Sequence, residues 1–147
     1  MNEPTEMELK YLVKNYFDLS DLILYLRANG FEATNIKFVI NEDSYFDTPN
    51  KDLLKNGGSF RIRKTNKGSI KGTFKYPIDN NDVYTKRLEI EKTLTENSFT
   101  ELINRFNNLQ YNLKSICPFP VLKINNQRQE ITLTKDNSCV VVAFDTI

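Results

Sequence analysis

The sequence predicts an α+β fold that is mainly β, an antiparallel sheet with helices packed against its apolar face. Segments such as Glu6-Met7-Glu8-Leu9-Lys10 and Arg61-Ile62-Arg63 place charged residues two apart, with apolar residues between them. Successive side chains of a β-strand point to opposite faces, so each segment predicts a strand with one charged face and one mostly apolar face. Two other segments, which follow Asp18 and Thr95, have capping residues or apolar spacing typical of helices.

The predicted elements follow the order β-α-β-β-β-β-α-β-β. Asp18 can cap the first helix, and Asn29-Gly30 ends it. The segment Thr65-Asn66-Lys67-Gly68 predicts a tight hairpin between the third and fourth strands. The predicted strands cover 5–14, 36–47, 59–65, 69–76, 83–92, 121–134 and 138–146. The first predicted helix ends at about Arg27, and the second covers about 98–109.

The composition indicates one globular domain over residues 1–147, with 39% apolar residues. The net charge of +1 argues against a nucleic-acid partner or a polybasic membrane surface. Because the chain has no histidine, histidine triads and histidine zinc sites are excluded. Cys117 and Cys139 are expected to be reduced thiols. No secretory segment or long apolar span is present, so we expect a soluble cytoplasmic protein.

The charged faces admit two architectures. An open antiparallel sheet would turn its apolar face to two helices and its charged face to water. A sheet closed into a barrel would instead enclose the charges and place the apolar faces outside, under the helices. Burial would cost several kcal/mol for each charge unless it were paired, hydrated or bound to a metal. A water-filled tunnel that holds a metal and a phosphate chain would meet that requirement.

Several motifs together resemble one known family. Glu6-x-Glu8-x-Lys10 is similar to the ExExK signature at the N-terminus of the CYTH superfamily, the triphosphate tunnel metalloenzymes. Further matching elements follow in the family's order, over nearly the whole chain. They are Asp43-Ser44-Tyr45-Phe46-Asp47-Thr48, Ser59-Phe60-Arg61-Ile62-Arg63, Thr73-Phe74-Lys75, Arg87-x-Glu89-x-Glu91, Arg128 and Asp145.

The resemblance implies an antiparallel β-barrel or tunnel of eight strands, of which seven can be read in this sequence. It implies hydrolysis of a triphosphate with a divalent metal, Mg²⁺ or Mn²⁺, and the hard oxygen ligands suit those ions. Inorganic tripolyphosphate is the expected substrate, and organic triphosphates are the other members of the class. The catalytic set implied by the signature is Glu6, Glu8 and Lys10. The phosphate-binding positions are Lys10, Arg61, Arg63, Lys75, Arg87 and Arg128, and the metal ligands are Glu6, Glu8, Glu89, Glu91 and Asp145.

Each assignment has a plainer alternative. The glutamates could merely pair with arginines on neighbouring strands. Tyr45 could be a core residue or carry a hydroxyl into the tunnel. Lys71 lies near a hairpin, where a solvated lysine is expected.

Family members continue into an eighth strand with a further Glu-x-Glu, and this chain ends at Ile147. The expectation is therefore a C-terminally truncated form, an incomplete barrel, or an exposed edge covered by a second copy or another partner. Turnover without that strand is open, and a non-catalytic binder of triphosphate or polyphosphate is the alternative function. Some relatives cyclise ATP, which gives adenylate cyclase as a third. The sequence does not rank the substrates or give the oligomeric state.

Overall fold

The computed structural model describes residues 5–13, 18–80 and 85–147. The described part contains eight strands, three α-helices and one 3₁₀ helix. The strands are β1 (Thr5–Glu8), β2 (Glu32–Ala33), β3 (Lys37–Phe46), β4 (Ser59–Thr65), β5 (Ile70–Asn80), β6 (Thr85–Thr93), β7 (Leu122–Lys135) and β8 (Ser138–Thr146); the helices are α1 (Leu19–Ala28), α2 (Asp52–Lys55), α3 (Phe99–Arg105) and η1 (Leu113–Ser115).

The chain forms two compact units. The first comprises residues 1–9 and 41–125, and the second comprises residues 10–40 and 126–147. Strands β3 and β7 each contribute residues to both units. Every strand pair whose register is described is antiparallel. This mainly β, antiparallel architecture confirms the predicted fold class.

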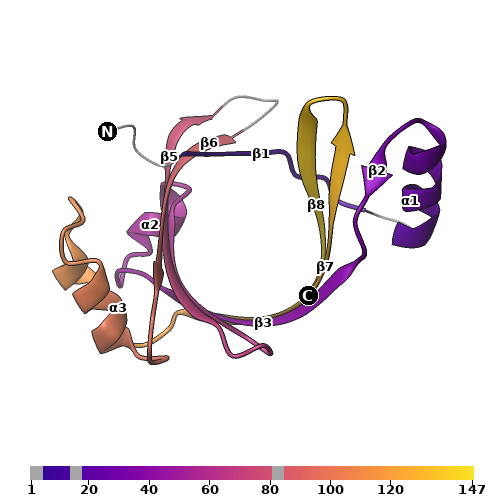
Figure 1. Ribbon diagram of the computed structural model, residues 1–147. Helices are drawn as coiled ribbons and strands as arrows, with labels where there is room; N and C mark the ends of the chain where they lie inside the picture. Colours follow the sequence, from indigo (N-terminus) through magenta and orange to yellow (C-terminus); the bar gives the residue numbers. More distant parts are fainter. Residues whose placement is uncertain (1–4, 14–17, 81–84) are drawn as a thin grey trace. The chain divides into compact units, whose positions relative to one another are not determined.

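The first unit has the strand order β1-β6-β5-β4-β3. Figure 1 shows β5 and β6 side by side, with α2 and α3 on one side of them. One face of its sheet is apolar, because Phe60 and Ile62 of β4 and Phe74 of β5 alternate with charged residues along their strands. These three side chains are at most 2% exposed and form a core with residues of α2, α3 and the segments beside them. The helices α2 and α3 therefore cover the apolar face of this sheet. Of the two predicted helices only α3 lies here, because α1 belongs to the second unit.

Gly72 allows α3 to lie close to the sheet. A Cβ atom at this position would lie 2.6 Å from Cδ1 of Leu102 and 2.9 Å from Cε2 of Phe106. Both of those side chains are buried in the same core. Two side chains from the helical segment thus occupy the space that a side chain at this position of β5 would need.

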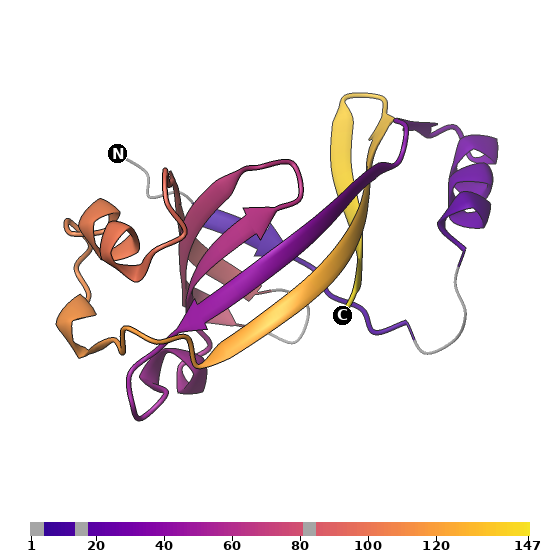
Figure 2. The same ribbon diagram turned by 90° about the horizontal axis from the view of Figure 1, so that it is seen from below.

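The second unit is built on the β7–β8 hairpin (Figure 2). Leu19 and Ile23 on one face of α1 form a core with Ile131 and Leu133 of β7. Asp18 caps α1 by accepting a hydrogen bond from the backbone N–H of Ser20 at 2.8 Å. Among the residues that the structure describes, no helix is long and apolar enough to cross a bilayer.

The observed elements follow the predicted order, with several differences. Strand β5 extends to Asn80 beyond the predicted residue 76, α3 ends at Arg105 rather than at about residue 109, and the 3₁₀ helix η1 is added. Strand β1 ends at Glu8, where the prediction extended to residue 14. The structure adds the two-residue strand β2 and the four-residue helix α2. Residues 83 and 84 of the predicted fifth strand lie outside the described residues. The prediction of a single domain over 1–147 stays a prediction.

Candidate functional site

The sheet face opposite the core of the first unit is strongly polar, and we call it the polar face. Direct cross-strand partners point to the same side of a sheet. The register pairs Tyr45 with Arg61, Arg61 with Thr73, and Thr73 with Glu91, so one row crosses four strands. The polar face comprises Asp43 and Tyr45 of β3, Arg61 and Arg63 of β4, Lys71, Thr73 and Lys75 of β5, and Arg87, Glu89 and Glu91 of β6.

Asp43 is the most buried charged residue of this face, at 3% exposed. Arg63 donates two short hydrogen bonds to it, from Nε to Oδ1 at 2.7 Å and from Nη2 to Oδ2 at 2.6 Å. Arg61 makes a longer contact, from Nη1 to Oδ2 at 3.4 Å, and the Tyr45 hydroxyl lies 3.5 Å from the same oxygen. A two-point guanidinium–carboxylate contact is strong and fixes the orientation of both groups. Arg63 is therefore held more firmly than Arg61.

Two lysines on β5 reach the carboxylates of β6. Lys75 Nζ lies 3.0 Å from Glu89 Oε2, and both side chains are less than a quarter exposed. Lys71 Nζ lies 2.6 Å from Glu91 Oε1, and both are nearly half exposed. The predicted metal ligands Glu89 and Glu91 thus each form an ion pair with a lysine of β5.

Among the buried donors of the polar face, two neighbouring ones have no hydrogen-bond partner in the described part of the chain. They are the Nε of Arg61 and the Oγ1 of Thr73, residues directly opposite each other on β4 and β5. A buried polar atom without a hydrogen bond costs about 1–3 kcal/mol, so such atoms are uncommon unless a ligand or water uses them. Their position among cations favours an anion as the missing partner.

The other predicted site residues belong to β1 or to the second unit. The register places the backbone of Glu6 opposite Arg87 and that of Glu8 opposite Thr85, and the side chains of both glutamates lie outside the described residues. Lys10 follows the end of β1 and belongs to the second unit. Arg128 and Asp145 also belong to that unit, where they form a two-point ion pair at 2.7 Å on β7 and β8.

The donor set can be compared with the needs of a divalent cation. Mg²⁺ and Mn²⁺ prefer oxygen ligands and keep several waters, so one or two carboxylates are enough to anchor them. Glu89 and Glu91 stand two apart on one face of β6 and supply such oxygens. No group of three or more metal-ligating side chains occurs among the described residues. The chemistry of the two glutamates fits a hydrated cation that phosphate oxygens also bind.

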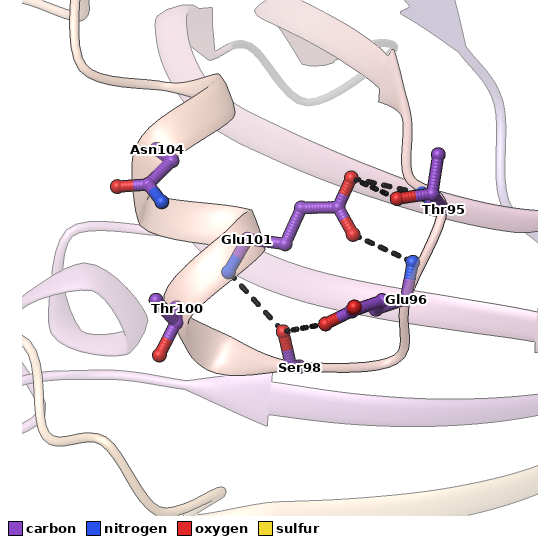
Figure 3. Close-up of a pocket in the computed structure, with 6 residues that line it drawn as sticks. All are labelled: Thr95, Glu96, Ser98, Thr100, Glu101 and Asn104. Carbon is purple, nitrogen blue, oxygen red and sulfur yellow. Dashed lines mark hydrogen bonds between the residues drawn. The ribbon is translucent and has the colours of Figure 1, made fainter.

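A shallow hollow at the start of α3 is a helix cap rather than a second site. Glu101 accepts hydrogen bonds from the backbone N–H of Thr95 at 2.9 Å and of Glu96 at 2.6 Å (Figure 3). Ser98 in turn accepts a hydrogen bond from the N–H of Glu101 at 3.2 Å. The bond from Thr95 is the largest effect on the Glu101 carboxyl and lowers its pKa, against the opposing effect of burial.

Sequence reasoning assigned no role to Asp43 or Thr73. Both stand in segments that match the family's motifs, and the alternation along β3 and β5 puts both on the charged side. Their partners depend on the register between strands, which residue spacing along one strand does not give. For Tyr45 the structure favours the tunnel-type alternative over core packing, because its hydroxyl lies 3.4 Å from Arg61 Nη1.

The CYTH domain family matches residues 4–147 of the chain. No match was found among curated proteins. Solved structures with the same fold include a candidate adenylate cyclase from Vibrio parahaemolyticus, with 16% identity, a TM-score of 0.53, and coverage of 100% of this chain and 78% of that one. A candidate adenylate cyclase from Bacillus halodurans has 16% identity and a TM-score of 0.54, with coverage of 99% and 73%. A candidate adenylyl cyclase from Hippeastrum, described as having a dominant triphosphatase activity, has 13% identity and a TM-score of 0.53, with coverage of 97% and 70%.

Proposed function

The chain belongs to the CYTH domain family, and we propose that it binds a triphosphate on the polar face and hydrolyses it with a divalent metal. The observation that carries this proposal is the row of partnerless buried donors, Arg61 Nε and Thr73 Oγ1, between flanking cations. Inorganic tripolyphosphate is the proposed substrate, since the described polar face contains no aromatic surface other than Tyr45 for a base or a thiamine ring. The family is generally dependent on divalent metals.

The proposed role of the basic residues is to hold and neutralise the phosphate chain. Arginine forks match the spacing of phosphate oxygens, and lysine supplies a compact charge. Lys75 and Lys71 lie on the strand next to Arg61 and Arg63, so the cations span two adjacent strands. A chain of three phosphoryl groups could then contact cations along its length. Fixed cations also stabilise the charge that develops as a phosphoryl group is transferred.

Glu89 and Glu91 would hold the metal, together with Glu6 and Glu8 if their side chains share this face. When bound, such an ion supplies charge neutralisation and an activated water. Because each of the two described glutamates is paired with a lysine, their binding of a cation would require those lysines to turn to the phosphate. Lysine side chains have enough rotamer freedom for that exchange.

The test is phosphate release from tripolyphosphate with Mg²⁺ or Mn²⁺, measured beside calorimetric binding. The proposal requires turnover that EDTA abolishes and that Arg61→Ala lowers by tenfold or more. A matched control is Glu42→Gln, which changes an exposed charge on the opposite side of β3 and should leave turnover intact. Absence of both turnover and binding in the folded protein would contradict the proposal.

A second candidate is a triphosphate or polyphosphate binder without turnover. It is favoured by the lack of a group of three metal-ligating side chains among the described residues. Tight binding of tripolyphosphate without phosphate release at any metal concentration would select it. Formation of cyclic AMP from ATP would instead select the cyclase activity that the names of two structural neighbours suggest.

A further inference from the structure

The two arginines of β4 differ in how they are held, although both reach the same carboxylate. Arg63 uses Nε and Nη2 in two bonds of 2.7 and 2.6 Å to Asp43. Arg61 makes contacts of 3.4 Å with Asp43 and with Tyr45 through Nη1, and its Nε has no partner in the described part of the chain. Both guanidinium groups are similarly covered, with 15% and 16% of the side chains exposed. Burial therefore does not explain the difference; the geometry around Asp43 does.

A buried carboxylate beside an anion-binding site should weaken the binding of an anion. Its negative charge opposes the negative charge of the ligand. The same carboxylate, however, fixes the planar fork of an arginine, and a fixed fork loses less conformational entropy when it binds phosphate. These two effects have opposite signs on anion affinity, so their balance can be measured.

We propose that Asp43 is a positioning residue for phosphate binding, which fixes Arg63 in place and leaves Arg61 available to turn its unpartnered Nε to the ligand. This inference deepens the proposed function and rests on it. Asp43 itself need not contact the phosphate chain, since it is almost fully buried beneath the two arginines it binds. Its carboxylate fixes the orientation of the Arg63 guanidinium through two short hydrogen bonds. Its single long contact with Arg61 leaves that guanidinium free to reorient.

The test compares Asp43→Asn with the wild type by calorimetry, using tripolyphosphate and orthophosphate at one fixed Mg²⁺ concentration. The asparagine variant makes the polar face one charge more positive. If only charge mattered, tripolyphosphate would bind more tightly. A positioning role predicts the opposite, a loss of about tenfold or more, which is the scale of one charge-assisted hydrogen bond. It also predicts that the preference for tripolyphosphate over orthophosphate falls, because only the longer ligand uses both arginines.

Glu42→Gln is the matched control, because it removes one negative charge from the next position on β3, where the side chain is exposed on the other face. Its affinity for tripolyphosphate should stay within about twofold of the wild type, since exposed charges are screened by salt. Tripolyphosphate affinity in Asp43→Asn that equals or exceeds that of the wild type would overturn the inference and leave the proposed function standing. No binding by the folded wild type would overturn both.

A double variant protects the test against misfolding. Asp43→Asn combined with Arg63→Gln replaces the ion pair by two neutral amides that can still bond to each other. If Asp43 acts through Arg63, the asparagine should cost less than about threefold in affinity when added to Arg63→Gln, because the interaction is already gone. A full tenfold further loss in that background would show that Asp43 acts independently of Arg63 and would overturn the inference.

Discussion

Arg61 and Arg63 occupy equivalent places in the sequence motif, yet they have different surroundings. Arg63 satisfies a buried carboxylate through two short bonds, whereas Arg61 adds one long contact to the same group. Removing one partner of a buried ion pair leaves the other charge without compensation, and the cost can reach about 3–5 kcal/mol when burial is complete. The two arginines should therefore differ in what they contribute to folding.

We predict that Arg63→Ala lowers the free energy of unfolding clearly more than Arg61→Ala does. Both variants should weaken tripolyphosphate binding, each by the worth of a charge-assisted contact, about 1.5–3 kcal/mol. Urea unfolding and calorimetry on the same preparations separate the two effects. Equal losses of stability in the two variants would contradict the asymmetry of the Asp43 contacts.

At the scale of elements, the contact between α3 and β5 depends on a glycine. An added methyl group at Gly72 would meet two buried side chains at 2.6 and 2.9 Å. Overpacking of a core costs about 1–3 kcal/mol, which exceeds the gain of about 0.4–1 kcal/mol expected from a less flexible unfolded chain. Gly72→Ala should thus be destabilising, as measured by urea unfolding.

The same variant placed with Leu102→Ala provides the internal check. The smaller side chain at 102 leaves room for the new methyl group, so the double variant should lose less stability than the sum of the two single losses. Strict additivity would mean that the helix does not approach the sheet at Gly72.

The cap of α3 makes a pH-dependent contribution to stability. Hydrogen bonds from Thr95 and Glu96 lower the pKa of Glu101 in the folded protein below its ordinary value of 4.5. A carboxyl with a lowered folded pKa stabilises the fold above the unfolded pKa, and that contribution is lost as the pH falls through the folded pKa. We expect Glu101→Gln to be less stable than the wild type at neutral pH and to lose less stability on acidification. Unfolding curves collected from neutral pH to pH values below 4.5 test this; parallel profiles would contradict it.

Local signals predicted the elements that strong alternation or turn residues define. Strand β4 has the predicted bounds because Ser59–Thr65 alternates cleanly and a glycine turn follows it. Helix α2 escaped prediction because four residues carry no helical period, and it depends on Asp47, which accepts hydrogen bonds from the N–H groups of Leu53 and Leu54 at 3.0 Å. The polar face was predicted through parity, whereas the pairing of Asp43 with both arginines required the register between β3 and β4.

For the whole molecule, charge is balanced globally and uneven locally. The chain carries 20 basic and 19 acidic residues, so it offers almost no overall attraction to an anion. The polar face, in contrast, has five cations against three carboxylates among its described members. On the proposed function, this local excess of cations would attract a triphosphate, and a divalent cation bound there would add to the attraction.

We therefore predict that tripolyphosphate affinity rises with Mg²⁺ and falls as salt increases. Mg²⁺ neutralises part of the negative charge of the ligand and of the carboxylates. Added salt screens the cations, with a Debye length of about 10 Å at 0.1 M. Calorimetric titrations over a series of NaCl concentrations, with Mg²⁺ or with EDTA, measure both effects. Arg61→Ala should show a shallower salt dependence than the wild type, because one cation is gone, and Glu42→Gln should follow the wild type. Affinity that is highest in EDTA and unaffected by salt would mean that the polar face is a structural ion-pair network and that the triphosphate, if it binds, binds elsewhere.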